Sequence, residues 1–335
     1  MLANLGLRRQ WAALLTFVLA SAGVTGLLAV FGLIEVLAAF LPAPGAPAPE
    51  AAWFGAGLVV TAAAAAAMLL PDVRSRLARL LPIDPASPVH ALALVLGVAL
   101  LGFNLSYQLS MDVLQQTATA ESPLTPLDLV AQETPFLLAG LLGVGWIVRR
   151  SGGGSLQRLG LVVPRWWQLA LGLAAAGAFY ALSTGVDYAG QLLTPDLAHK
   201  VEVANDHLFG GLNNPPGIIT LALAAGICEE VLFRGALQPR FGIVFTSLLF
   251  TSVHTQYGIS LDTLGVFVIS SGLGLLRRFF NTTTSLTCHV CYDLLVGVGV
   301  GLTLLPWALA VEAALLGLLA FAFVRGRRPA LAVRP

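Results

Sequence analysis

The chain has 335 residues, of which 57% are hydrophobic and 10% are charged, and it carries a net charge of +1. A soluble globular protein has roughly 25% charged residues, so the composition excludes a soluble domain. The basic residues are spread between apolar segments, which also excludes a nucleic-acid-binding patch. We predict an all-α membrane protein, a polytopic bundle of transmembrane helices in contact with the lipid bilayer and without a nucleic-acid partner.

Apolar segments that approach the roughly 20 residues needed to cross a bilayer recur along the whole chain. In chain order, the predicted spans are residues 13–40, 51–70, 88–110, 135–148, 166–183, 216–233, 241–257, 260–276, 284–303 and 306–324. We therefore expect about ten membrane spans.

The loops between these segments alternate in charge. Arginine residues occur near 8–9, 74–79, 149–165, 234–240, 277–278 and 325–328, and the intervening loops are poor in basic residues and often acidic. Under the positive-inside rule, this alternation predicts an even number of spans with both termini in the cytoplasm. We expect a multi-pass protein of the cell membrane, which in a bacterium is the inner membrane.

The segment 151–155, Ser-Gly-Gly-Gly-Ser, has the composition of a flexible linker. It divides the predicted spans into two regions. Residues 1–150 form an N-terminal four-helix membrane region without candidate site residues, and residues 151–335 carry all of the candidates.

Three consecutive apolar segments of the second region contain ionisable side chains that a bilayer would exclude. They are Glu229, Glu230, Arg234, His254, His289 and Asp293. An ionised group at bilayer depth costs several kcal/mol, so such groups usually face a protein interior and serve a function. Two adjacent carboxylates and two histidines are suited to proton transfer or to metal binding.

Helical spacing separates the roles of the two glutamates. Glu230 and Arg234 lie four residues apart, so they share one helix face and are within reach of an ion pair. Glu229 is rotated about 100° from Glu230, which leaves it free to face a cavity and act as a general base. The alternative is a structural Glu–Arg pair near a helix end.

Both histidines also have partners at helical spacing. His254 follows Phe250 by four residues and His289 precedes Asp293 by four, so the members of each pair share a helix face. Asp293 is thereby placed to orient the imidazole of His289 or to stand beside it. A structural His–Asp pair is the alternative here.

The three motifs follow one another on successive predicted helices. Glu-Glu-Val-Leu-Phe-Arg-Gly at 229–235 is followed by Phe-Thr-Ser-Val-His at 250–254 and by His-Val-Cys-Tyr-Asp at 289–293. This order resembles the CPBP family, which comprises CAAX prenyl endopeptidases, bacteriocin-processing enzymes and Abi immunity proteins. The resemblance covers residues 214–302. Outside this segment, the chain shares with the family only the general character of membrane helices.

The resemblance implies an intramembrane endopeptidase that hydrolyses a peptide bond of a prenylated or otherwise membrane-associated protein or peptide. It implies a catalytic domain at 151–335 with a site made of Glu229, Glu230, Arg234, His254, His289 and Asp293. In such a site Glu229 acts as base on a water molecule with His254 beside it. Glu230 and Arg234 hold Glu229 in place.

The third motif departs from the family pattern, which often ends in Asn where this chain has Asp293. Asn donates a hydrogen bond to a developing oxyanion, whereas an ionised Asp would repel it. Asp293 is therefore expected to be protonated, to orient His289 or to support a metal. Together His289 and Asp293 would complete the site as oxyanion stabilisers or as ligands.

The resemblance admits both a metalloprotease and a metal-independent glutamate protease, so no cofactor is assigned. If a metal is present, zinc is the candidate, with Glu229, His254 and His289 as its ligands and a water in the open position. The chain has no His-Glu-x-x-His motif, so the spacing gives no independent support for a metal.

Two other functions would use the same residues. A proton-coupled transporter would use them as a relay, although the chain shows no inverted repeat and gathers its candidates in one region. A non-catalytic immunity or scaffold protein would keep the fold without the reaction.

A protease requires Glu229, His254 and His289 to act on one water molecule and therefore to lie at similar depth. This condition is met if the sixth helix runs on past Arg234 toward Gln238, or if the seventh helix is tilted and shifted. Pro239 favours the first, because it offers a stop one turn beyond Arg234. We expect one cavity in the cytoplasmic half of the bilayer, which opens to the cytoplasm or to lipid with Arg234 at its rim.

Overall fold

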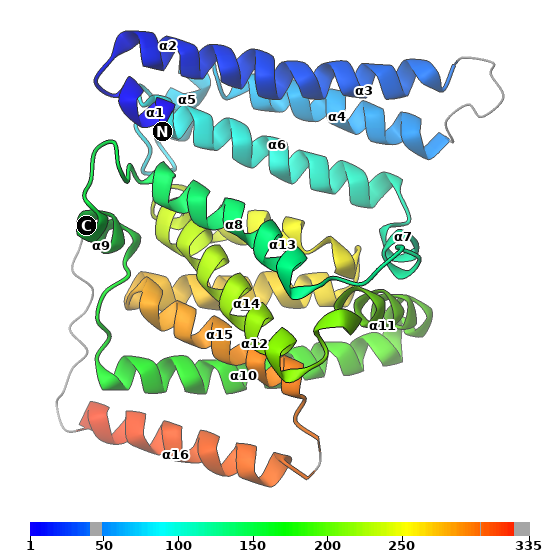
Figure 1. The fold of residues 1–335 in the computed structure, drawn as a ribbon, viewed down its shortest axis with the longest axis vertical. Coiled ribbons are helices and arrows are strands. Elements are labelled where there is room, and N and C mark those ends of the chain that lie inside the picture. The colour runs from blue at the N-terminus through cyan, green and yellow to red at the C-terminus, as the bar shows by residue number, and fades with distance from the viewer. Residues whose placement is uncertain (41–48, 302, 325–335) are drawn as a thin grey trace.

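The computed structural model describes residues 1–40, 49–301 and 303–324. Within these ranges the chain folds into helices joined by loops and contains no β-strand. The long helices run roughly side by side and stack in layers (Figure 1). The predicted all-α helical bundle is confirmed.

Each predicted span contains a helix. In chain order the helices are α2 (Gln10–Val18), η1 (Leu19–Gly26) and α3 (Leu27–Ala38), which form one continuous helix, then α4 (Pro49–Ala67), α6 (Pro88–Ser110), α8 (Pro126–Gly143), α10 (Trp166–Leu193), α12 (Pro215–Glu229) with η3 (Glu230–Leu237), α13 (Gln238–Val253), α14 (Leu261–Phe279), α15 (Thr282–Val298) and α16 (Leu305–Val324). Among the described residues, 5 helices are long and apolar enough to cross a membrane. The protein is a membrane protein, and ten spans stay a prediction.

Short helices mark the two ends of the bundle. α1 (Leu2–Gly6), α5 (Pro71–Leu77) and α9 (Gly152–Leu159) lie at the left of Figure 1, whereas α7 (Val113–Ala118) and α11 (Pro195–Phe209) lie at the right. The left-hand ends carry the arginines at 8–9, 74–79, 149–165, 240 and 277–278, and we call them the arginine end. The right-hand ends carry Asp112, Glu202 and Asp206, and we call them the acidic end. Arginines 325–328 lie outside the described residues, and the membrane side of each end stays a prediction.

Residues 151–155 do not form the flexible linker expected from their composition. Ser151 caps α9, because its Oγ accepts a hydrogen bond from the backbone N–H of Gly154 at 3.2 Å. At the other end of α9, Leu159 is fully buried in a cluster with Val231 of η3. The cap and this apolar contact outweigh the low helix propensity of the glycines.

The first three long helices form a layer that packs on the rest of the bundle through α6. Within it α3 and α4 approach closely, since a Cβ added at Gly32 would lie 2.6 Å from the carbonyl oxygen of Gly55. Such close contact between small residues is typical of packed membrane helices. α6 then packs against α13, where Leu94 and Phe241 belong to one buried cluster.

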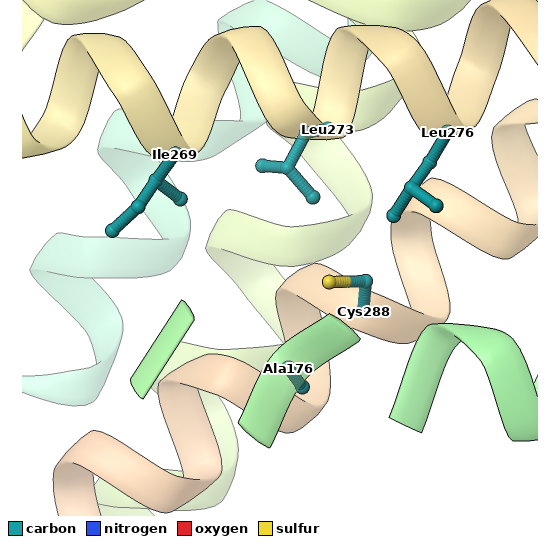
Figure 2. Packing of buried hydrophobic residues seen from close by; sticks show 5 residues of the cluster. All are labelled: Ala176, Ile269, Leu273, Leu276 and Cys288. Carbon is teal, nitrogen blue, oxygen red and sulfur yellow. The ribbon is translucent and has the colours of Figure 1, made fainter. Parts of the chain in front are cut away.

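α12 and η3 occupy the centre of the second layer, in contact with α8 and α15. Beside them, α10, α14 and α15 enclose a buried apolar cluster (Figure 2) made of Ala176, Ile269, Leu273, Leu276 and Cys288. Burial of Cys288 fixes the rotation of α15 about its axis. The next residue, His289, consequently turns toward η3, where it meets Glu230.

α13 is kinked near its start at Gly242, which has φ 74° and ψ 176°. A positive φ is readily available only to glycine, so this residue permits the kink. The helix that carries Glu229 continues past Arg234 to Leu237, as the depth argument from the sequence requires.

Candidate active site

The two adjacent glutamates stand where α12 continues into the π-helical segment η3. Glu230 is completely buried. Its Oε2 accepts a hydrogen bond from Ser285 Oγ at 2.5 Å, and its Oε1 lies 3.1 Å from Nδ1 of His289 and 3.6 Å from Nε of Arg234. Both oxygens of Glu230 are therefore occupied by partners from η3 and α15.

Arg234 is buried one turn beyond Glu230, toward the arginine end. Its Nη2 donates to Ser270 Oγ at 3.2 Å, and its guanidinium carbon lies 4.5 Å from the centre of the Phe250 ring, a cation–π distance. The expectation that Arg234 forms the rim of a cavity is wrong. Phe250 lines the cavity and covers the guanidinium of Arg234, so Arg234 itself is not among the cavity-lining residues.

Glu229 has a different environment from its neighbour. Its side chain is also buried, but its Oε2 has no hydrogen-bond partner among the described residues and lies 3.7 Å from Nε2 of His289. Glu229 lines a cavity of about 790 Å³, whereas Glu230 does not. The geometry agrees with the predicted division between a paired Glu230 and a Glu229 that faces a cavity.

His289 connects the acidic groups of the site. Its Nδ1 lies 3.1 Å from Oε1 of Glu230, and its Nε2 lies 3.7 Å from Oε2 of Glu229 and 3.6 Å from Oδ2 of Asp293. The imidazole is thus held between three carboxylates. Asp293 lies one helical turn further along α15, so it is placed to orient His289, and its Oδ2 has no hydrogen-bond partner in the described part of the chain.

His254 caps the C-terminus of α13 and lines the same cavity. Its Nδ1 lies 2.8 Å from the backbone carbonyl oxygen of Phe250, and its ring stacks on the Phe250 ring at 4.6 Å. A carbonyl oxygen only accepts hydrogen bonds, so Nδ1 carries the proton and Nε2 is left for the cavity. The Phe250 ring also lies 5.9 Å from that of His289, so it contacts both imidazoles.

Glu229, His254 and His289 therefore line one cavity, as the depth argument predicts. The expectation was an opening to the cytoplasm, predicted for the arginine end, or sideways to lipid. The exposed lining residues of the cavity, among them Glu202, Asp206 and Gly297, lie at the acidic end. Under the predicted topology this is the face away from the cytoplasm.

The arginine end of the site is closed by α9. Arg158 donates from Nη1 to the carbonyl oxygen of Gly235 at 3.3 Å. A Cβ on Gly235 would lie 2.8 Å from Cδ2 of Leu159, so the glycine of the first motif permits this close contact. Burial, together with the nearby Arg240, lowers the pKa of Arg158 to about 10, so it remains charged at neutral pH.

The residues expected to bind zinc do not fit a metal site as they are arranged. Within residues 1–40, 49–301 and 303–324, no group of three or more His, Cys, Asp or Glu side chains is placed to hold a metal ion. His289 has Glu230 on its Nδ1, and His254 is fixed against Phe250.

Among the cavity carboxylates that the sequence did not single out, Glu133 is the most buried. Glu133 of α8 is 9% exposed and lines the cavity, and its Oε2 has no hydrogen-bond partner among the described residues. Phe136, also in α8, lies 5.7 Å from Phe233 by ring centres. The region 1–150, expected to carry no site residues, thus contributes a helix to the cavity.

The sequence signal for the start of α8 would have placed Glu133 within a helix. Thr125 and Asp128 form a capping box around Pro126 at the first helical turn, and this combination marks a helix start. The predicted span began only at residue 135, which left Glu133 in an acidic loop.

Glu229, His289 and Asp293 thus gather at one cavity within a bundle of apolar helices, and comparison with known families concerns the same part of the chain. Residues 211–295 match the family model of the type II CAAX prenyl endopeptidase Rce1-like domain. This confirms the resemblance for the segment that carries the three motifs. The matched segment contains Glu229, His254 and His289.

One curated relative is the uncharacterized protein YpbD of Bacillus subtilis, which is 34% identical over 121 residues. The match covers 32% of this chain and 63% of the length of that relative. No solved structure gives a significant match.

Proposed function

We propose that this chain is an intramembrane endopeptidase in which Glu229 activates a water molecule. The observation that carries the proposal is the difference between two neighbouring carboxylates. Glu230 is occupied by Ser285, His289 and Arg234, whereas Glu229 keeps a buried oxygen without a partner at the wall of a cavity. Such a desolvated, accessible carboxylate is suited to general-base catalysis.

In the proposed reaction, a water molecule in the cavity gives a proton to Glu229 while its oxygen adds to the scissile carbonyl carbon. Negative charge then develops on the carbonyl oxygen and needs hydrogen-bond donors. The imidazoles of His254 and His289, which line the same cavity, can donate them from Nε2 when protonated. The proton held by Glu229 passes to the leaving amine as the carbon–nitrogen bond breaks.

Glu230 and Arg234 have a positioning role in this proposal. Glu230 contacts Nδ1 of His289, which fixes the direction in which Nε2 points. Arg234 neutralises Glu230 and packs on Phe250, the ring against which His254 stacks. The pair thereby holds both imidazoles from the side away from the cavity. Asp293 orients His289 from the cavity side.

The test is cleavage of membrane-associated peptides by the purified protein in detergent, followed by mass spectrometry. We expect Glu229→Gln to lower kcat by at least about 100-fold while the protein stays folded. Metal content of the same preparation, and activity after chelation, decide between the metal-dependent and metal-independent forms. Near-normal turnover by Glu229→Gln would refute the assignment, and proton uptake by proteoliposomes without any peptide cleavage would favour a transporter.

A further inference from the structure

The cavity has a strongly one-sided charge. Besides Glu229 and Asp293, its lining contains five carboxylates: Glu133, Asp187, Glu202, Asp206 and Asp262. Among the described residues that line it, there is no Lys or Arg. A cavity lined by one sign of charge attracts ligands of the opposite sign.

Glu133 is the carboxylate that distinguishes this cavity from an acidic surface. It lies on α8, which packs directly against α12, the helix that ends with Glu229. Its side chain is 9% exposed and its Oε2 is buried without a hydrogen-bond partner in the described part of the chain. Glu133 is also close enough to His289 and Asp293 for their charges to interact.

A buried carboxylate oxygen without a donor is costly, and among the described residues no Lys or Arg lines the cavity beside Glu133. The one arginine of the site, Arg234, is committed to Glu230 and separated from the cavity by Phe250. The missing partner is therefore best supplied by a ligand. A Lys or Arg side chain carries several N–H donors on a positive charge and satisfies a carboxylate completely.

We propose that the cavity binds a cationic segment of the peptide substrate, with Glu133 as the residue that accepts hydrogen bonds from a Lys or Arg side chain close to the scissile bond. This inference rests on the proposed endopeptidase activity, because Glu133 shares the cavity with Glu229. It defines the substrate by charge at a position near the cleavage site.

The entrance of the cavity fits the same substrate. Glu202 and Asp206 of α11 are exposed at the acidic end, and Asp187 of α10 lies within hydrogen-bond reach of Asp262 of α14. These carboxylates line the path from the acidic end to Glu133. A cationic peptide would therefore enter from the end of the bundle opposite the arginines, where the attraction is greatest.

The experiment uses two membrane-associated peptides that differ only in Lys or Met next to the cleaved bond. We expect the wild-type protein to cleave the Lys peptide with a kcat/KM at least about tenfold higher, mainly through a lower KM. Glu133→Gln should abolish this preference, measured as the ratio of kcat/KM for the Lys and Met peptides, and Glu133→Asp should keep part of it. Glu121→Gln is the matched control, because Glu121 is exposed and does not line the cavity.

Binding separates this inference from the proposed function. A fluorescent Lys peptide is titrated against Glu229→Gln and against the Glu229→Gln/Glu133→Gln double variant, with anisotropy as the readout. Tighter binding of the Lys peptide that depends on Glu133 supports the cation site even if no peptide is cleaved. If protein with Glu133 intact binds and cleaves the Lys and Met peptides equally well, the cation site is refuted. Because both peptides are still cleaved in that case, the proposed endopeptidase activity is retained.

Discussion

The Glu230–Arg234 pair gives the most direct test of the energetics of the site. The two side chains are 0% and 1% exposed, and Nε of Arg234 lies 3.6 Å from Oε1 of Glu230. With an effective dielectric constant of ~20, this distance corresponds to a Coulomb attraction of about 5 kcal/mol. Removal of one partner leaves the other charge buried and uncompensated, which typically costs about 3–5 kcal/mol.

We therefore expect Arg234→Met to lower the free energy of unfolding by about 3–5 kcal/mol. Glu230→Gln should have a similar effect, because it leaves the guanidinium of Arg234 without its carboxylate. The double variant should lose less than the sum of the two single variants, with a coupling between about 0.5 and 3 kcal/mol.

Equilibrium unfolding in detergent micelles by added sodium dodecyl sulfate measures these differences. Arg76→Met is the control, since Arg76 is exposed on α5 and should change the unfolding free energy by less than about 0.5 kcal/mol. Losses below about 1 kcal/mol in both single variants, or strict additivity in the double variant, would contradict a buried, mutually dependent ion pair.

Three further predictions concern topology, packing and Asp293. Reporter fusions after Arg79 should report the cytoplasm and fusions after Gly210 the opposite side; the reverse result would place the cavity mouth in the cytoplasm. Gly235→Ala should destabilise the protein by about 1–3 kcal/mol, because the added Cβ would lie 3.1 Å from the backbone of α9. Gly153→Ala is the control, since its Cβ would meet nothing within 4 Å, and it should leave the thermal unfolding temperature unchanged. Asp293→Asn should keep the rate of peptide cleavage within about tenfold, whereas Asp293→Leu should lower it at least about 100-fold, since only the amide retains a polar group beside His289. Equal activities of the two variants would refute the role of Asp293 in orienting His289.

The sequence predicted the pairs that helix geometry imposes. Glu230 with Arg234 and His289 with Asp293 are each four residues apart on one helix, and both pairs lie in contact in the structure. The continuation of the sixth helix beyond Arg234 to Leu237 was predicted on another ground, that Glu229, His254 and His289 must lie at similar depth. Predictions of this kind depend only on local spacing, which a helix converts directly into position.

Local helical spacing does not predict contacts between segments that are distant in the sequence. Glu133 enters the cavity from α8, nearly one hundred residues before Glu229, and no spacing rule connects the two. α11 was expected to be a polar loop, yet Val201 and Ala204 are buried against Leu114 and support a helix at the acidic end. Both helices contribute exposed residues to the cavity lining, so local spacing could not predict where the cavity opens. The membrane side to which the cavity opens stays a prediction.

The balance of charge connects the structure of the site to its proposed substrate. Glu133, Glu229, Glu230 and Asp293 bring four carboxylates into one buried region, and among the described residues Arg234 is the only permanent cation in contact with them. Glu230 uses that cation, and His289 can balance at most one more carboxylate. The remaining excess must be met by bound protons or by a bound cation, because unpaired buried charge is unfavourable. In the proposed reaction Glu229 carries the proton taken from water, and in the proposed complex the substrate supplies a cation beside Glu133. Under both proposals the same excess of carboxylates serves the reaction and selects what the cavity binds.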